Sequence, residues 1–230
     1  MTISMRIFIV TVGVMALAGP TAAQTPVAVV EDVQGKVTGA EFMDYVVPGN
    51  VIKLGPAATL VLGYMKSCRR ETTTGAGTVT VGKEESMVQD GHVVASKVKC
   101  DSGHSLLIDQ QVHESAATSF RGLDIAGSQS PSLTLYGLSP IFETTGRGKL
   151  VVERLDVKGE RHEIDLAAAP VVRRKFYDFA KTGTSLKPGG TYAASLGGQR
   201  TVFVIDSRAE PGAAPIVGRL VRLQTVEDAR

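Results

Sequence analysis

The sequence predicts an all-β protein made of two small β-sandwich or roll domains, preceded by a helical signal peptide. Short runs of apolar and β-branched residues alternate with turn residues along the chain. Glycine occurs 25 times, and its conformational freedom favours turns and short strands over long helices. In the first half, no helical period persists over about 11 residues, the window in which an amphipathic helix is recognised. Together these observations favour sandwiches or rolls of short strands.

Residues 1–23 have the three regions of a secretory signal peptide. Arg6 supplies the positive charge, and residues 7–18 form an uncharged, mostly apolar run. A Gly-Pro pair and small residues follow, so we expect cleavage after Ala23. The apolar run is shorter than the about 20 residues that a membrane span needs. With no cysteine at the cleavage point for a lipid anchor, we expect a periplasmic or secreted bacterial protein.

The charge balance limits the classes of partner. Lys and Arg number 25 against 23 Asp and Glu, which leaves a net charge of +2. A balance this small provides neither the basic surface that binds nucleic acid nor a polybasic membrane anchor. We therefore expect no nucleic-acid partner and, after signal cleavage, no stable membrane anchor.

Apolar runs lie between turn signals in the first half. Residues 59–65 carry apolar side chains on both faces, with Leu60, Leu62 and Tyr64 on one of them, which is typical of a central strand. The turn residues 89–91 indicate a hairpin. The expected strands cover residues 27–33, 37–47, 51–54, 59–65, 78–81, 92–98 and 106–108.

Small polar residues at 126–131 form the predicted linker. The linker separates a first β domain, residues 24–125, from a second, residues 132–230. We expect few apolar side chains to join the two domains.

The second half continues the strand pattern. Residues 149–156 and 161–166 indicate a hairpin. Residues 171–180 place apolar side chains at helical spacing, which favours a short amphipathic helix, although the start of a strand also fits. Further strands are expected at residues 132–135, 191–196 and 201–206, and the spacing within residues 216–221 slightly favours helix over strand.

The chain has two cysteines, Cys68 and Cys100. In an oxidising compartment such a pair is first interpreted as a disulfide. Closing a loop of about 32 residues removes roughly 3.5–4 kcal/mol of denatured-state entropy in the loop-closure estimate. Two free buried thiols, or a metal site that includes His104, are the alternatives. We expect each cysteine to end a strand, at residues 59–65 and 92–98, and both sulfurs to lie at the same end of the domain.

Residues 49–62 resemble the core of the FecR-type periplasmic domain, because Gly-x-x-Ile precedes a small-residue turn and an alternating strand. Residues 33–37 and 77–81 are similar to the opening and later strands of that family. The resemblance covers about residues 27–100 and implies a periplasmic β domain. Family members that regulate sigma factors carry a cytoplasmic helical segment and a transmembrane helix before the domain, and we expect neither here. Residues 186–192 resemble a turn of immunoglobulin- or fibronectin-like modules.

The sequence carries no complete catalytic motif. The sequence contains no Gly-x-Ser-x-Gly elbow and no His-Glu-x-x-His. Asp101, Ser102 and His104 are nearly adjacent, whereas the members of a catalytic triad usually come from separated segments. We predict no catalytic, cofactor-binding or metal-binding residue. A small envelope hydrolase, with His104 or His162 in a site assembled by the fold, is the alternative.

One candidate binding surface surrounds Cys68. Tyr64, Lys66, Arg69 and Arg70 form a basic, partly aromatic group that a disulfide would stiffen, suited to an anionic glycan or to carboxylates of a partner protein. A solvated strand end is the alternative interpretation.

A second basic group, residues 173–175, precedes aromatic side chains and is either a binding surface or the polar face of an amphipathic segment. The sequence as a whole therefore predicts a non-catalytic, exported binding or scaffold protein of the cell envelope. Its expected partner is an envelope protein or a glycan.

Overall fold

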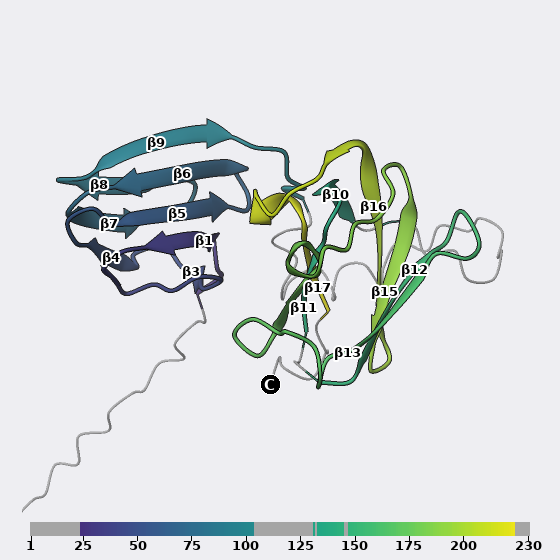
Figure 1. Cartoon of the computed structure of the whole chain (residues 1–230). Helices are drawn as coiled ribbons and strands as arrows, with labels where there is room; N and C mark the ends of the chain where they lie inside the picture. Colours follow the sequence, from purple (N-terminus) through teal and green to yellow (C-terminus); the bar gives the residue numbers. More distant parts are fainter. Residues whose placement is uncertain (1–23, 104–130, 132, 145–146, 224–230) are drawn as a thin grey trace, which may run out of the picture.

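The computed structural model describes residues 24–103, 131, 133–144 and 147–223. It confirms the all-β fold class (Figure 1). In these residues the only helices are two short 3-10 helices, η1 (Phe179–Thr182) and η2 (Ile216–Gly218). The predicted signal peptide, the predicted strand at residues 106–108 and nearly all of the predicted linker lie outside the described residues.

Two sheets form the first half. One has the order β3-β1-β5-β6-β9 and the other β2-β4-β7-β8. The strands are β1 (Ala28–Gln34), β2 (Val37–Thr38), β3 (Tyr45–Val46), β4 (Val51–Leu54), β5 (Thr59–Tyr64), β6 (Arg69–Thr74), β7 (Gly77–Val81), β8 (Ser86–Gln89) and β9 (His92–Lys97).

Strand β5 is central in its sheet, as its two apolar faces predict. Leu60, Leu62 and Tyr64 point into the core between the two sheets, where they meet Val79 and Val81 of β7. The opposite face of the same sheet is also covered, so both sets of alternating side chains are buried.

The predicted hairpin at residues 89–91 is wrong: strand β8 pairs with β7, whereas β9 pairs with β6 in the other sheet. The chain crosses between the sheets at Gly91, where a Cβ would lie 3.1 Å from the Val88 side chain and 3.3 Å from that of Thr73. Turn residues indicate where the chain changes direction. Which strand then pairs with β9 depends on contacts with residues distant in the sequence.

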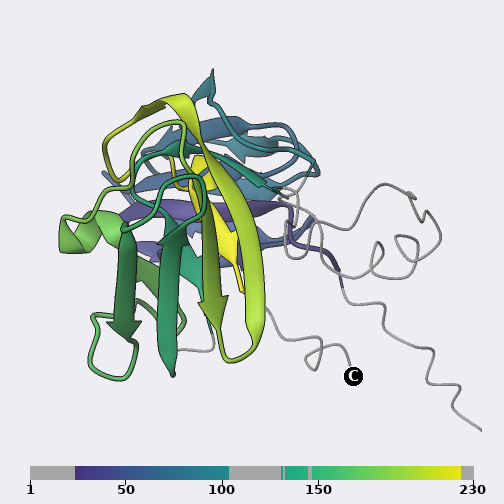
Figure 2. The ribbon, with the colours of Figure 1, turned by 90° about the vertical axis from the view of Figure 1, so that its right-hand side faces the viewer.

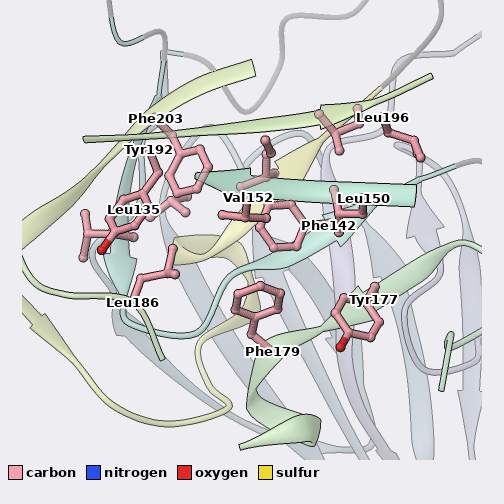
Figure 3. Close-up of a cluster of buried hydrophobic side chains, with 14 of the residues drawn as sticks. Leu135, Phe142, Leu150, Val152, Tyr177, Phe179, Leu186, Tyr192, Leu196 and Phe203 are labelled. Atoms are coloured by element: carbon pink, nitrogen blue, oxygen red, sulfur yellow. The ribbon is translucent and has the colours of Figure 1, made fainter. Parts of the chain in front are cut away.

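The second half also has two sheets, ordered β10-β16-β15-β12-β13 and β14-β11-β17. Their strands are β10 (Leu133–Gly137), β11 (Ile141–Glu143), β12 (Lys149–Arg154), β13 (Arg161–Asp165), β14 (Phe176–Asp178), β15 (Thr191–Leu196), β16 (Gln199–Glu210) and β17 (Leu220–Arg222). Strands β12 and β13 form the predicted hairpin. Phe142 lies in the core between the sheets, with its ring 5.1 Å from that of Phe179 and 6.2 Å from that of Phe203 (Figure 3).

The amphipathic helix favoured for residues 171–180 is absent. Arg173 and Arg174 adopt positive φ angles of 49° and 62°, which no right-handed helix can contain. The strand β14 follows, with Phe176 on one face and Tyr177 on the other. Residues 216–221 divide between η2 and β17, so neither helix nor strand alone describes them.

A third apolar cluster joins the halves, contrary to the expectation that few apolar side chains would do so. The outer face of the sheet that contains β1 and β5 packs on the three-stranded sheet and on η2. The buried members are Val29, Met43 and Met65 from the first half and Ile141, Phe176, Ile216, Val217 and Leu220 from the second. The four sheets therefore form successive layers; Figure 2 shows the second half in front of the first.

A buried carboxylate reinforces this junction. Glu31 accepts a hydrogen bond from the backbone N–H of Val217 at 2.9 Å and pairs with Arg70 at 2.8 Å. The absence of a side chain at Gly63 leaves room for it, since a Cβ there would lie 2.5 Å from the Glu31 Oε1. The predicted boundary between the domains stays a prediction, but the two halves share a core.

Candidate functional site

The disulfide between Cys68 and Cys100 is present, with the sulfurs 1.94 Å apart and the Cα atoms 5.5 Å apart. Cys68 lies in the turn between β5 and β6 rather than at the end of a strand, and Cys100 follows β9. Strands β6 and β9 pair with Arg69 opposite Lys97, which brings both sulfurs to one end of the sheet. Because both sulfurs are bonded to each other, neither cysteine is a free thiol or a metal ligand.

The predicted surface around Cys68 is divided by the fold. Tyr64 is buried in the core rather than exposed, and its hydroxyl lies 2.8 Å from Ser86 Oγ. Burial raises the pKa of Tyr64 to about 12. Arg70 lies on the opposite face of the sheet and pairs with Glu31, beside the junction of the halves. The four residues therefore do not form one patch, and the aromatic member is missing from the surface.

Lys66 and Arg69 do stay on the outside, each with acidic partners. Lys66 pairs with Glu84 at 3.4 Å. Arg69 pairs with the buried Glu71 at 2.6 Å and with Glu85 at 3.4 Å. The hydrogen bond from Arg69 to Glu71 raises the pKa of the guanidinium above its ordinary value. Both cations therefore already have acidic partners within the chain.

Arg69 lines a groove of about 400 Å³ at the open side of the first sandwich. Glu84 and Glu85, in the connection between β7 and β8, form one wall, and the end of β9 forms the other. Ser67, Ala95, Ser96 and Lys97 complete the lining. The groove thus carries both signs of charge and runs beneath an edge strand.

Strand β9 is that edge strand (Figure 1), and all six of its residues are exposed. It is the last strand in its sheet, with β6 on one side and no partner among the described residues on the other. Two apolar side chains lie in the open, Val93 at 38% and Val94 at 59% exposure. An exposed edge with apolar side chains is a template for pairing with another extended chain.

The hydrogen-bonding direction of β9 follows from one contact at its end. The backbone N–H of Val98 donates to Cys68 O at 2.9 Å, toward β6. Because N–H and C=O groups alternate in direction along a strand, those of Val94 and Ser96 also point to β6. Those of Val93, Ala95 and Lys97 point away from the sheet. The outer edge therefore presents three N–H groups and three C=O groups in register.

Sequence reasoning placed a strand at residues 92–98 but missed its role as an edge. A usable signal was present. Residues 92–96 contain no Lys, Arg, Asp or Glu, whereas charged side chains occupy every second position of residues 161–165.

The second predicted basic segment belongs to the junction of the halves. Arg173 pairs with Glu41 and, at 2.8 Å, with Asp44. Lys175 pairs with Glu143 at 3.4 Å and lies 5.5 Å above the Tyr45 ring. Tyr45 is partly buried, and its desolvation raises the pKa of its hydroxyl. These cations therefore bind the chain's own carboxylates.

The residues considered for hydrolysis do not form a site in the part of the chain that the structure describes. Asp101 accepts a hydrogen bond from the N–H of Thr134 at 2.9 Å. His162 stacks edge-on against Phe179, with ring centroids 5.6 Å apart, and its Nε2 makes no hydrogen bond to a described residue. His104 lies outside the described residues.

The described residues contain no group of three or more His, Cys, Asp or Glu side chains arranged to hold a metal ion. Among them, no helix has the length and apolar character needed to cross a membrane.

No family model, curated protein or solved structure matches the chain significantly. The resemblances of the first half to a FecR-type domain and of the second half to an immunoglobulin- or fibronectin-like module therefore stay predictions.

Proposed function

We propose that the chain is a non-catalytic, exported binding protein of the bacterial cell envelope, and that it holds an extended segment of another envelope protein against strand β9. The observation that carries the proposal is the open edge of β9, with six exposed residues at the rim of a five-stranded sheet. In β-strand addition, backbone hydrogen bonds provide affinity and side-chain pockets provide selectivity.

The edge is preformed, which favours binding. The disulfide fixes the end of β9 beside the turn that precedes β6. An ordered edge loses little conformational entropy when a partner strand pairs with it. A disulfide also agrees with the oxidising compartment that the predicted signal peptide implies.

The surroundings of β9 select what can bind. Val94 offers an apolar contact on one face of the edge. On the other face, the groove brings Arg69 and Lys97 close to Glu84 and Glu85. A partner segment with alternating apolar and charged residues would satisfy both faces. A glycan has no peptide backbone to extend the sheet, so the edge favours a protein partner.

Site-specific photocrosslinking tests this function. A photoreactive residue replaces Val94 on β9 in one variant and Lys158, at the exposed turn of the β12–β13 hairpin, in another. Both are expressed in cells that export the chain. We expect a discrete protein adduct from position 94 and none from position 158.

A second substitution shows whether the adduct depends on backbone pairing. Ala95→Pro removes an outward N–H from β9, a position where an edge strand tolerates proline. Glu163→Pro makes the matched change on the edge strand β13. The adduct should disappear with Ala95→Pro and persist with Glu163→Pro. An adduct that survives Ala95→Pro, or a glycan captured in its place, contradicts strand addition.

A further inference from the structure

A second site lies where the two halves meet, on a part of the surface that the proposed function does not use. It is a pocket of about 230 Å³ between the end of β9 and the second sandwich. Val98 and Lys99 of the first half form one side. Tyr136, Arg208, Glu210 and the chain at residues 211–218 form the rest. The volume is just below the range of about 300–1,000 Å³ for sites of drug-sized molecules, so the pocket suits a smaller ligand.

The floor of the pocket depends on two close approaches. At Gly218 a Cβ would lie 2.5 Å from the carbonyl oxygen of Lys99, so only glycine lets the two halves meet there. At Gly137 a Cβ would lie 3.2 Å from the side chain of Arg219. These two approaches fix the backbone at Gly137 and Gly218, both of which line the pocket.

The buried side chain of Arg219 contacts the segment that forms part of the pocket wall. Its side chain is buried and pairs with Asp178 at 2.8 and 3.2 Å. It also donates to the carbonyl oxygens of Ser139 and Ala213. The contact with Ala213 fixes the segment that continues to Pro215 in the pocket lining. A buried ion pair is weak evidence for stability but can define one arrangement of the chain.

The charged side chains that line the pocket make no ion pair with another described residue. Arg208 and Glu210 lie two residues apart on β16, and residues at this spacing share one face of a strand. Among the residues that the structure describes, neither forms an ion pair, and Lys99 forms none either. Two cations and one carboxylate thus converge on a small pocket whose other walls, at Val98, Pro211 and Pro215, are apolar.

We propose that this pocket binds a small zwitterion of the free α-amino acid class, with a short aliphatic side chain. The carboxylate of the ligand pairs with Arg208 and Lys99, and its ammonium group pairs with Glu210. The aliphatic side chain lies against the prolines and Val98. The proposal rests on the geometry of this pocket alone and does not depend on the function of β9.

Titration of the whole mature protein with L-valine tests the proposal. The readout is the chemical shift of the backbone amides of Gly137 and Gly218, followed by two-dimensional NMR into the millimolar range. Valinamide, which lacks the carboxylate, and 3-methylbutanoate, which lacks the ammonium group, are the comparison ligands. We expect saturable shifts with L-valine and at least about 10-fold weaker binding of each analogue, because each loses a charge-assisted contact.

Two variants test which side chain pairs with the carboxylate of the ligand and which pairs with its ammonium group. Arg208→Gln and Glu210→Gln should each weaken L-valine binding by about 10-fold or more. Glu210→Gln should also abolish the preference for L-valine over 3-methylbutanoate. Arg174→Gln, which changes an exposed arginine elsewhere in the second half, should leave the affinity unchanged. The absence of saturable shifts at both glycines, equal affinity for the three ligands, or equal effects of Arg174→Gln and Arg208→Gln would overturn the proposal.

Discussion

Strands β9 and β13 are each the last strand of a five-stranded sheet, one in each half of the molecule. The two free edges differ in the side chains that flank them. On β13, the outward residues Arg161 and Glu163 pair with each other at 2.9 Å. Each also has a partner on the neighbouring β12, Glu153 and Lys149. Charged side chains of this kind discourage another strand from pairing.

On β9, the corresponding positions carry no such network. Val93 is 38% exposed, and no ion pair joins β9 to its neighbour β6 in the described part of the chain. The comparison indicates that the fold protects one edge and leaves the other accessible. This contrast, rather than the mere presence of an edge, supports a role for β9 in binding.

The largest expected effect comes from breaking the disulfide. Cys100→Ser, or reduction of the wild type, should lower the free energy of unfolding by about 2–5 kcal/mol. This loss of stability should appear first as faster amide exchange at the end of β9, while the exchange rates in β13 stay unchanged. Chemical denaturation with and without reductant, followed by hydrogen exchange, measures both. Equal acceleration of exchange in β9 and β13 would show that the bond does not act locally on β9.

The second-largest expected effect is a loss of stability from a substitution in the sheet that contains β9. Gly63→Ala places a methyl group against the Glu31 carboxylate, which Arg70 and the N–H of Val217 hold in place. We expect a destabilisation of about 1–3 kcal/mol from overpacking. Gly103→Ala is the control, because a Cβ there makes only an ordinary contact at 3.6 Å. Similar unfolding midpoints for the two variants in urea would refute this account of the junction.

Removing the charges from β13 should make it resemble β9. The double variant Arg161→Val/Glu163→Val deletes the outward ion pairs and adds β-branched apolar side chains. We expect association of the protein at high concentration, seen by sedimentation velocity, with a change in stability within about 0.5 kcal/mol, as for most surface substitutions. A variant that stays monomeric at every concentration would mean that the charges do not protect the edge.

The smallest effect is a pH dependence at the β12–β13 hairpin. The hydrogen bond from Arg154 lowers the pKa of Asp156 to about 2. Because the folded pKa lies below the unfolded value, this pair contributes to stability above about pH 4, and the contribution is lost as the pH falls through about 2. NMR titration of the Asp156 carboxyl measures the pKa, and Arg154→Gln should move it toward the ordinary value. No movement would rule out Arg154 as the cause.

Local patterns in the sequence predicted much of the fold. The alternation at residues 59–65 predicted a central strand, and the pattern at residues 149–166 predicted a hairpin, because both depend on neighbouring residues. The same alternation placed Tyr64 with Leu60 and Leu62, so its burial was already indicated. The disulfide was predictable because the chain has one pair of cysteines.

Other features depend on contacts between distant segments. The pairing of β9 with β6 depends on where the chain crosses at Gly91, and the shared core depends on how the outer face of one sheet meets another. The helix expected at residues 171–180 failed because Arg173 and Arg174 turn the chain so that their segment meets the first half. A single sequence carries no local signal for any of these three.

Amide hydrogen exchange along β9 in the free, dilute protein tests the central claim most directly. If the outer edge is open, protection alternates: the amides of Val94 and Ser96, which point to β6, exchange slowly, and those of Val93, Ala95 and Lys97 exchange rapidly. Uniform protection of all five amides would mean that the edge is already covered, and would contradict a site that is free to bind a partner strand.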